Sequence, residues 1–248
     1  MFKMVLSDAD VLKKSIPIIA EILDEGVFKV DQNGLSLLCP DRTMVSVVDF
    51  SVPSGAFDEF QADAAEEVGL NMASLVDVIK RIKASDKVII QSAKDSKVNI
   101  TLEGNGLRKF RLSVLDMKTE TPPIDQLKFP GKVELKSEVL EEGIADADII
   151  SDSLVMQAGP EAFRISTKGD TSSAELELKK GQEGLLDMQA AENIRARYPL
   201  EYLKKMIKAA KISDKAVLEF GTDYPMRLGF VEKDKVSLKF VLAPRVED

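Results

Sequence analysis

The sequence LVDVIKRIKASDKVII, residues 75–90, contains the pattern around which the chain is organised. Its apolar residues recur at helical spacing and then run together, which predicts a short amphipathic helix, a turn and a buried strand. The pattern occurs again as LKKMIKAAKISDKAVL at residues 203–218, so that Ser85 returns as Ser213 at an offset of 128 residues. An internal duplication whose two copies both present lysines on a helix is the observation from which the other predictions start.

Composition bounds the class of protein. A chain of 248 residues with 44% hydrophobic and 31% charged residues is typical of one or two folded domains. Apolar runs stay well short of the roughly 20 residues that a membrane-spanning helix needs, and the start, Met1 to Met4, shows no apolar signal core. A single cysteine, Cys39, excludes an internal disulfide framework and favours a reducing compartment. We therefore expect a cytoplasmic protein without membrane partners.

The residues of an active site are not found in the sequence. The chain has no histidine, the usual acid–base group at neutral pH and the commonest zinc ligand. Cys39 has no histidine to activate it, and Asp146 and Asp148 stand two apart on a predicted helix, where they do not face each other. The glycines at 104–106 precede a strand and not a helix, so they predict a hairpin turn and not a phosphate loop. We expect no catalytic residue, no metal site and no cofactor.

The first half of the chain predicts strands and two helices. After a strand at 2–6, Ser7 or Asp8 is placed to cap a helix through Leu23, in which Pro17 predicts either a kink or a late start. Asn33-Gly34 predicts a hairpin between strands at 27–30 and 35–39. The remaining predicted elements are strands at 45–52 and 68–71, a helix at 72–83, and strands at 87–91, 98–103 and 107–115.

The second half repeats this plan and predicts an α+β fold, with helices on one side of antiparallel sheets. Residues 116–131, DMKTETPPIDQLKFPG, predict an extended connector between domains at 1–115 and 132–248. Its apolar residues Ile124, Leu127 and Phe129 either tuck against the surface or form part of a binding site. The predicted elements of this half are helices at 137–150 and 199–211 and strands at 132–136, 154–158, 162–166, 171–178, 184–189, 215–220, 225–231 and 235–241.

Positive charge is concentrated on the duplicated helices. The net charge is −8, yet the segments 72–83 and 199–211 carry net charges of about +2 and +3. Lysines without interleaved aromatic residues suit contact with phosphates better than reading of bases. A single run of this kind is more often a solvated helix face, and the duplication is what favours a function. The helix at 137–150, in contrast, holds five carboxylates and no basic residue.

Several motifs, taken in order along the chain, resemble one family. They are Val11-Leu12-Lys13-Lys14, the segment from Asp41 to Val45-Ser46, Gln126-Leu127-Lys128-Phe129-Pro130, and the terminal LAPRVED at 242–248. With these motifs the whole chain resembles sliding clamps of the proliferating cell nuclear antigen type, in their archaeal form. The resemblance implies a duplicated DNA-clamp fold, in which three subunits form a ring of six similar domains with helices lining a central hole and sheets outside.

The resemblance also implies a function without chemistry. Duplex DNA passes through the hole irrespective of its sequence, and DNA polymerase, clamp loader, flap nuclease and ligase attach through short peptides. We expect DNA contact from nine basic residues: Lys13, Lys14, Lys80, Arg81, Lys83, Lys204, Lys205, Lys208 and Lys211. The family's partner-peptide pocket carries over to Pro40, Met44, Val45, Val47, Leu127, Phe129, Pro225, Val241, Ala243 and Pro244.

Ring closure is expected at unpaired strand edges, which associate readily. The strands concerned are 108–115 and 171–178, where Arg108, Lys109 and Arg111 would face Glu175 and Glu177. A second hypothesis pairs Glu141 or Glu142 with Arg81 or Lys83 of the neighbouring subunit.

Two alternatives to a self-trimerising clamp are considered. One is a subunit of a heterotrimeric or checkpoint-type ring, which the native mass of the purified protein would distinguish from a homotrimer. The other is a small-molecule enzyme that uses carboxylates. The lack of histidine and of a convergent site makes this second alternative remote.

Overall fold

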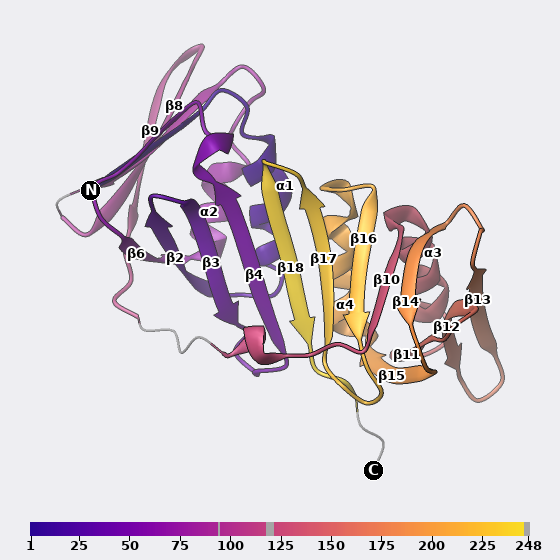
Figure 1. The fold of residues 1–248 in the computed structure, drawn as a ribbon. Coiled ribbons are helices and arrows are strands. Elements are labelled where there is room, and N and C mark those ends of the chain that lie inside the picture. Colours follow the sequence, from indigo (N-terminus) through magenta and orange to yellow (C-terminus); the bar gives the residue numbers. More distant parts are fainter. Residues whose placement is uncertain (94, 118–121, 246–248) are drawn as a thin grey trace. The chain divides into compact units, whose positions relative to one another are not determined.

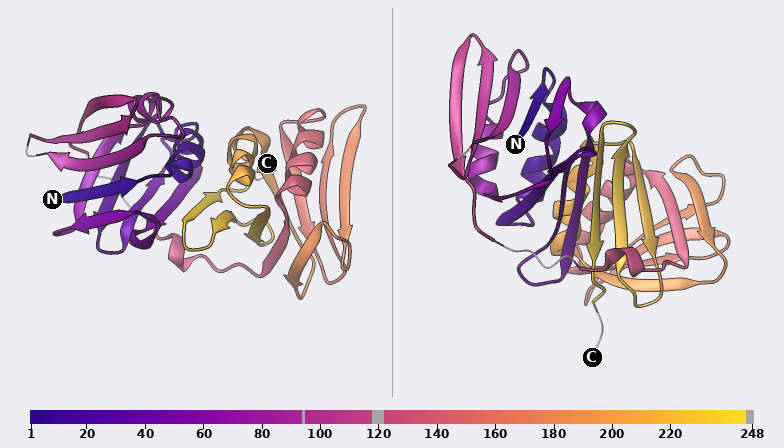
Figure 2. Two further views of the ribbon diagram at one scale, coloured as in Figure 1. Left: turned by 90° about the horizontal axis from the view of Figure 1, so that it is seen from above. Right: turned by 60° about the vertical axis from the view of Figure 1, so that its left-hand side comes forward.

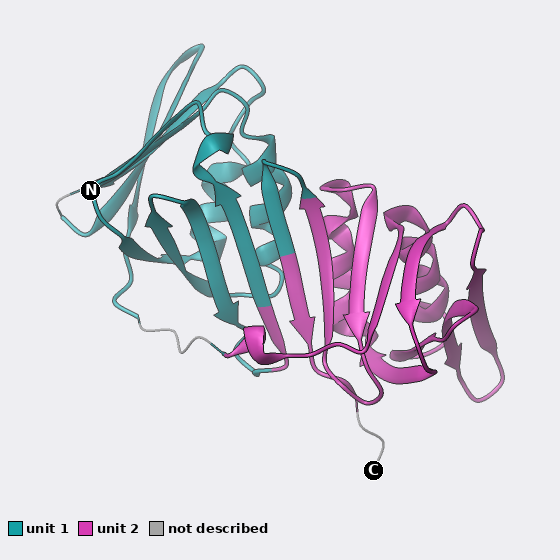
Figure 3. Cartoon of the chain, in the orientation of Figure 1, with its two compact units in different colours: residues 1–44, 48–122, 232–238 teal, residues 45–47, 123–231, 239–248 magenta. Residues whose placement is uncertain are grey.

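A computed structural model describes residues 1–93, 95–117 and 122–245. The chain folds into two compact units, coloured separately in Figure 3. Three strands contribute residues to both units, namely β4 (Ser46–Pro53), β18 (Val236–Leu242) and, by its last residue, β17 (Met226–Glu232). Unit 1 comprises Met1–Met44, Val48–Pro122 and Glu232–Leu238, and unit 2 comprises Val45–Val47, Pro123–Val231 and Lys239 onward.

Unit 1 contains two antiparallel sets of strands and two helices (Figure 1). The helices α1 (Asp10–Ile19) and α2 (Met72–Ile79) pack against each other. One set has the order β5-β1-β7-β8-β9, and in the other β2 pairs with both β3 and β6. The strands are β1 (Phe2–Leu6), β2 (Glu25–Asp31), β3 (Gly34–Pro40), β5 (Glu59–Ala62), β6 (Glu66–Asn71), β7 (Lys87–Ala93), β8 (Lys97–Gly104) and β9 (Gly106–Ser113).

Unit 2 repeats the plan, and its helices also lie side by side (Figure 2). They are α3 (Ser137–Asp148) and α4 (Leu200–Met206), the latter continued by the 3₁₀ turn η3 (Ile207–Lys211). The strands have the orders β14-β10-β16-β17 and β13-β12-β11-β15. Their bounds are β10 (Gly131–Lys136), β11 (Ser153–Ala158), β12 (Ala162–Lys168), β13 (Ser173–Lys179), β14 (Leu185–Ala190), β15 (Ile194–Pro199), β16 (Lys215–Phe220) and β17 (Met226–Glu232).

Strand register confirms the duplication. Phe28 pairs with Val68 in unit 1, and the residues 128 positions later, Met156 and Ala196, pair in unit 2. The same holds for the pairing of β7 with β8 and of β16 with β17. A shift of one residue would turn the apolar side chains out of the core, so identical register means identical core faces. The predicted α+β clamp plan is confirmed.

Local sequence signals explain two of the predicted elements. The β2–β3 hairpin closes at Gly34, whose φ is +137° and where a Cβ would lie 2.2 Å from the Val52 carbonyl oxygen. Only glycine tolerates both conditions. The start of α2 is capped by the Asn71 side chain, which accepts a hydrogen bond of 2.9 Å from the Ser74 N–H.

The helix limits correct several predictions. The first helix begins at Asp10 after Ala9, where the Asp8 side chain accepts a 2.9 Å hydrogen bond from the Asp10 N–H, and it ends at Ile19 and not at Leu23. Pro17 lies inside it near the end, so a start beyond the proline is wrong. The second helix ends at Ile79 and not at 83, because the chain continues there in tight turns.

Two strands, β5 and β15, were not predicted. The residues of β15 alternate between buried Ile194, Ala196 and Tyr198 and more exposed neighbours, which is a recognisable strand pattern. The four residues of β5 bury none of their side chains fully, so they carry no such signal.

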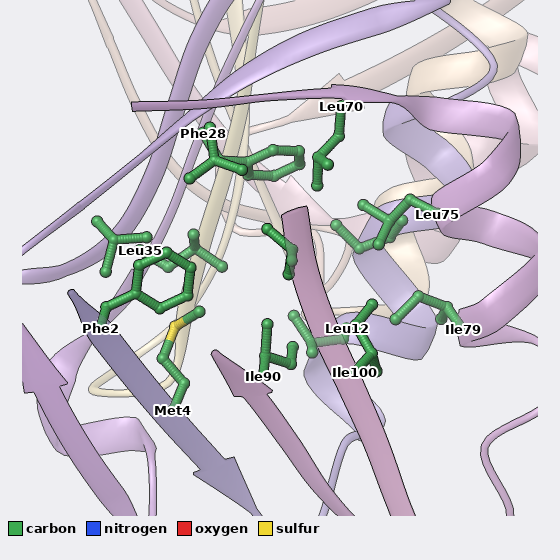
Figure 4. A pocket seen from close by; sticks show the side chains of 14 residues that line it. Phe2, Met4, Leu12, Phe28, Leu35, Leu70, Leu75, Ile79, Ile90 and Ile100 are labelled. Carbon is green, nitrogen blue, oxygen red and sulfur yellow. The ribbon is translucent and has the colours of Figure 1, made fainter. Parts of the chain in front are cut away.

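A cavity of about 50 Å³ lies in the core of unit 1 (Figure 4). Fourteen apolar side chains from both helices and both sets of strands line it, with Leu35 and Leu70 among them. At the 128-residue offset unit 2 has Phe163 and Tyr198, both fully buried. The Tyr198 hydroxyl donates a 2.8 Å hydrogen bond to the Tyr224 carbonyl, and burial raises its pKa. The second core therefore contains aromatic rings where the first has leucines.

This difference predicts that Leu70→Phe fills the cavity. We expect the free energy of unfolding to rise by about 1 kcal/mol, as cavity-filling substitutions commonly give. The reciprocal change Tyr198→Leu should lower it by about 3 kcal/mol, because it opens a cavity and leaves a buried carbonyl without its donor. Chemical denaturation monitored by circular dichroism measures both. A loss of more than about 1 kcal/mol for Leu70→Phe would show that the leucine core cannot accept a ring.

Candidate nucleic-acid and partner interfaces

The first cluster of cations lies just beyond α2. Lys80 is the C-cap, and Arg81 and Ile82 continue in turns whose N–H groups bind the carbonyls of Val78 and Ile79 at 2.9 and 3.1 Å. The side chains of Lys80, Arg81 and Lys83 are exposed. A helix C-terminus carries partial negative charge, so cations are stable there. This turn therefore presents three positive groups at the end of one helix.

A buried carboxylate holds this turn in place. Asp86 is only 3% exposed and accepts a 2.7 Å hydrogen bond from the Lys83 N–H. The Arg108 guanidinium pairs with Asp86 and also donates a 3.0 Å hydrogen bond to the Arg81 carbonyl. The Lys83 N–H, helped by Arg108, lowers the pKa of Asp86. Gly104 leaves the space that this needs, since a Cβ there would lie 2.2 Å from Asp86 Oδ1.

This arrangement changes the interpretation of Arg108. The sequence suggests it for the subunit interface, but its guanidinium binds partners within its own chain. Asp86 belongs to the repeated Ser-Asp-Lys motif, and this repetition was the signal in the sequence that could have identified Asp86 as important. Its counterpart Asp214 is exposed, and Val236 stands at the offset of Arg108. The carboxylate–guanidinium anchor is thus found in unit 1 only.

The second cluster of cations lies on α4 and η3, where several side chains have acidic neighbours. Lys204 Nζ lies 2.9 Å from Asp148 Oδ1 at the end of α3. Lys205 Nζ lies 3.4 Å from Glu201 one turn earlier, and 5.4 Å from the centre of the Tyr202 ring. The four predicted cations of this segment, Lys204, Lys205, Lys208 and Lys211, are therefore close in sequence but not alike in their surroundings.

The cations of α1 are less prominent. Lys13 and Lys14 are half-buried, and Lys14 Nζ lies 2.9 Å from Asp10 Oδ2. An i,i+4 pair of this kind contributes only a few tenths of a kcal/mol to the helix, but it places a carboxylate beside the lysine. The half-buried position and this carboxylate make the two residues less accessible to a phosphate than the exposed cations after α2.

The described part of the connector is held to unit 2 by an arginine. Ile124, in the 3₁₀ turn η2 (Ile124–Gln126), is buried, and its carbonyl accepts a 3.1 Å hydrogen bond from Arg227. The Arg227 guanidinium also lies 4.9 Å from the centre of the Phe129 ring, a cation–π distance. Phe129 meets Tyr224 edge-on at 6.0 Å. Of the two predicted roles, Ile124 tucks inward, whereas Leu127 and Phe129 remain half-exposed.

The residues predicted for the peptide pocket are divided between the units. Within unit 2 the Ala243 N–H donates a 2.9 Å hydrogen bond to the Val45 carbonyl, which brings the end of the last strand next to the segment 45–47. Val47 and Val241 are buried, and Pro225 and Pro244 are half-exposed. Pro40 and Met44 belong to unit 1, where Met44 is 65% exposed.

The described residues after the last strand, β18, are held by contacts within unit 2. The Arg245 N–H binds the Arg197 carbonyl at 2.8 Å, and its guanidinium lies 2.6 Å from Asp152, whose pKa it lowers. Residues 246–248 of the terminal motif and 118–121 of the connector lie outside the described residues.

Both strands predicted for ring closure are sheet edges. β9 ends one set of strands in unit 1 and β13 ends one in unit 2. Arg111 pairs with Asp95 at 2.6 Å, and Glu177 accepts from Arg164 Nε at 2.5 Å with Lys179 Nζ at 3.2 Å. The predicted Lys109 and Glu175 are exposed. Each edge thus carries surface charge beside unpaired backbone.

Two further findings concern residues 1–93, 95–117 and 122–245. Among them, no three acidic or cysteine side chains gather in a way that could hold a metal ion. No helix in that part of the chain is long and apolar enough to cross a membrane.

Four residues that hold the connector and the end of the chain in place were not predicted from the sequence. Tyr224 and Arg227 hold the connector, and Arg245 with Asp152 holds the end of the chain. They lie far apart in sequence from what they contact, and a single sequence carries no signal for such pairs.

Known proteins are similar to this chain over its full length. A family model described as the N-terminal domain of proliferating cell nuclear antigen matches residues 1–125, and that of the C-terminal domain matches 123–245. The DNA polymerase sliding clamps of Thermococcus gammatolerans and Pyrococcus horikoshii are each 33% identical over 247 residues, which cover 100% of this chain and 99% of each relative.

Solved structures share the fold. The proliferating cell nuclear antigen (PCNA) of Thermococcus kodakaraensis aligns with a TM-score of 0.92 at 23% identity, and the PCNA2–PCNA3 complex of Sulfolobus tokodaii with 0.90 at 26%. Each alignment covers 99% of this chain and 100% of the other. The repeated strand register, the paired helices and these full-length matches together place the chain in the proliferating cell nuclear antigen family.

Proposed function

We propose that the protein is a DNA sliding clamp, a ring that encircles duplex DNA and tethers DNA polymerase to its template. The observation that supports this best is the repeated helix end with exposed cations, Lys80 to Lys83 in one unit and Lys204 to Lys211 in the other, in a chain of this family. A clamp of this family is a scaffold and performs no reaction. The alternative of a carboxylate-based enzyme is therefore dropped.

The charge distribution suits sliding. An acidic protein with localised cations attracts phosphate by long-range charge, and lysines that read no bases bind all sequences alike. The nine predicted residues remain the proposed contacts, with Lys80, Arg81 and Lys83 first because Asp86 and Arg108 hold their turn in place. A cytoplasmic location is part of this proposal, since the clamp works on the cell's DNA.

Partners are proposed to dock a short peptide against unit 2 beside the connector. Half-exposed Leu127 and Phe129 offer apolar surface, and Arg227 and Tyr224 hold the Phe129 ring in position. Recognition of this kind rests on a few apolar anchors that enter a preformed surface. Besides polymerase, we propose clamp loader, flap nuclease and ligase as users of this surface, with residues 116–131 as the connector between domains 1–115 and 132–248.

The docking surface predicts a selective defect for Phe129→Ala. We expect affinity for the polymerase to fall about thirtyfold, the equivalent of about 2 kcal/mol for loss of an interface anchor. Stimulation of synthesis on a primed template should fall with it, while the native mass stays unchanged. Leu186→Ala, which trims another exposed apolar residue of unit 2, is the matched control. Equal stimulation by both variants would place the docking surface elsewhere.

Self-association is proposed to join β9 of one subunit to β13 of the next. Paired edges satisfy backbone groups that are otherwise left to water. Because Arg108 is bound to the buried Asp86, whereas the Arg111–Asp95 pair lies at the surface, Lys109 and Arg111 are the cations proposed to meet Glu175 and Glu177. The pairing of Glu141 or Glu142 with a neighbouring subunit stays a prediction. The Sulfolobus tokodaii structure is a complex of two different PCNA chains, so a ring with more than one kind of subunit remains the second candidate.

The ring contact predicts charge-dependent assembly. Sedimentation of the wild-type protein should give the mass of three chains, and Arg111→Glu should shift it toward one chain because two acidic edges then repel. Adding Glu175→Lys to this variant should restore the larger mass. A wild-type monomer or dimer would favour the mixed ring, and an undisturbed Arg111→Glu trimer would exclude this pairing of edges.

A further inference from the structure

Several carboxylates of α3 lie near lysines of α4 and η3. At one end, both oxygens of Asp148 lie close to Lys204 Nζ, at 2.9 and 3.1 Å. Figures 1 and 2 show that the two helices lie side by side, and the ion pair joins them. The two side chains are 41% and 49% exposed, so the pair lies at the surface of unit 2, where a phosphate could otherwise reach the lysine.

At the other end, the same helices border an open hollow of about 760 Å³. Glu138 and Glu141 of α3 line it from one side, and Lys208 and Lys211 of η3 from the other. Carboxylates of α3 thus lie near lysines of α4 and η3 at both ends of the helix pair. Asp148 and Lys204 are in direct contact.

Unit 1 differs in this respect. The side chains of Lys80, Arg81 and Lys83 make no ion pair within the described residues of the chain, and Asp86, which holds their turn, is buried and bound to Arg108. The helix end of unit 2 has the larger net charge by sequence, about +3 against about +2, but the Asp148 carboxylate beside Lys204 cancels this difference. A count of lysines in the sequence therefore overestimates the electrostatic attraction of unit 2 for DNA.

We propose that Asp148 is an internal counter-ion that makes Lys204 the weakest of the proposed DNA contacts in unit 2. The inference rests on the proposed clamp function and concerns how strongly each unit holds the duplex. A lysine that binds a phosphate normally gains by releasing condensed counter-ions from the DNA. Lys204 must first break its ion pair with Asp148, so exchanging this carboxylate for a DNA phosphate contributes little to the free energy of binding. Unit 2 consequently binds the duplex more weakly than its lysines suggest, and unit 1 supplies more of the attraction. Weaker binding lets the ring slide along the duplex more easily.

The test compares Asp148→Asn with Asp146→Asn. Both remove one negative charge from α3, but only the first releases a lysine, because Asp146 is exposed and makes no ion pair within the described residues. Binding of a fluorescent duplex is measured by anisotropy over a series of salt concentrations. We expect Asp148→Asn to bind about fivefold more tightly than Asp146→Asn and to steepen the plot of log K against log salt by about 0.9. Equal affinities and slopes for the two variants would overturn the proposal.

Two further variants keep the result interpretable. Lys204→Gln should remove the added slope of Asp148→Asn, and in the wild-type protein it should reduce the slope by clearly less than Lys80→Gln does. Equal reductions by these two variants in the wild-type protein would also overturn the proposal, even if the asparagine variant fails to fold. Lys80→Gln should reduce the slope by about 0.9. If Lys80→Gln has no effect, the proposed DNA contact itself fails. If it has its effect while Asp148→Asn matches Asp146→Asn, only the counter-ion inference fails.

Discussion

The buried carboxylate of Asp86 is the interaction on which the positive surface of unit 1 depends. Removing a carboxylate from water is unfavourable unless donors replace the lost hydration. The Lys83 N–H and the Arg108 guanidinium supply them, and Arg108 also binds the Arg81 carbonyl. These contacts hold the turn after α2 in place, and its cations remain exposed. Fixing cations on a short turn spares the entropy of ordering a loop when DNA approaches.

The duplication gives the chain two similar units whose differences are functional. Several of their strand pairs keep the same register at the 128-residue offset, yet the Asp86–Arg108 anchor belongs to unit 1 and the Asp148–Lys204 pair to unit 2. Their cores differ as well, since Tyr198 fills a position where Leu70 lines a cavity. A duplicated fold thus keeps its backbone pairing while its surface charge changes from one copy to the other.

Much of the fold could be predicted from the sequence, because hydrophobic period and the 128-residue offset are local or repeated signals. The hairpin at Gly34 followed from such a pattern. The end of α2 did not, since the turn after Ile79 depends on Arg108, a residue that lies far along the chain. The sites were predicted by residue type and by resemblance. Which lysines have a carboxylate beside them could not be predicted, because Asp148 and Lys204 meet only through helix packing.

The central claim is that the protein holds DNA by encircling it and not by a tight bond. Retention on a closed circular plasmid tests this most directly, with the protein loaded by its clamp loader and then washed in high salt. An encircling ring should stay on the circle through the wash and should slide off once a restriction enzyme cuts the plasmid. Release by salt from the uncut circle, or retention on the cut plasmid, would contradict the account.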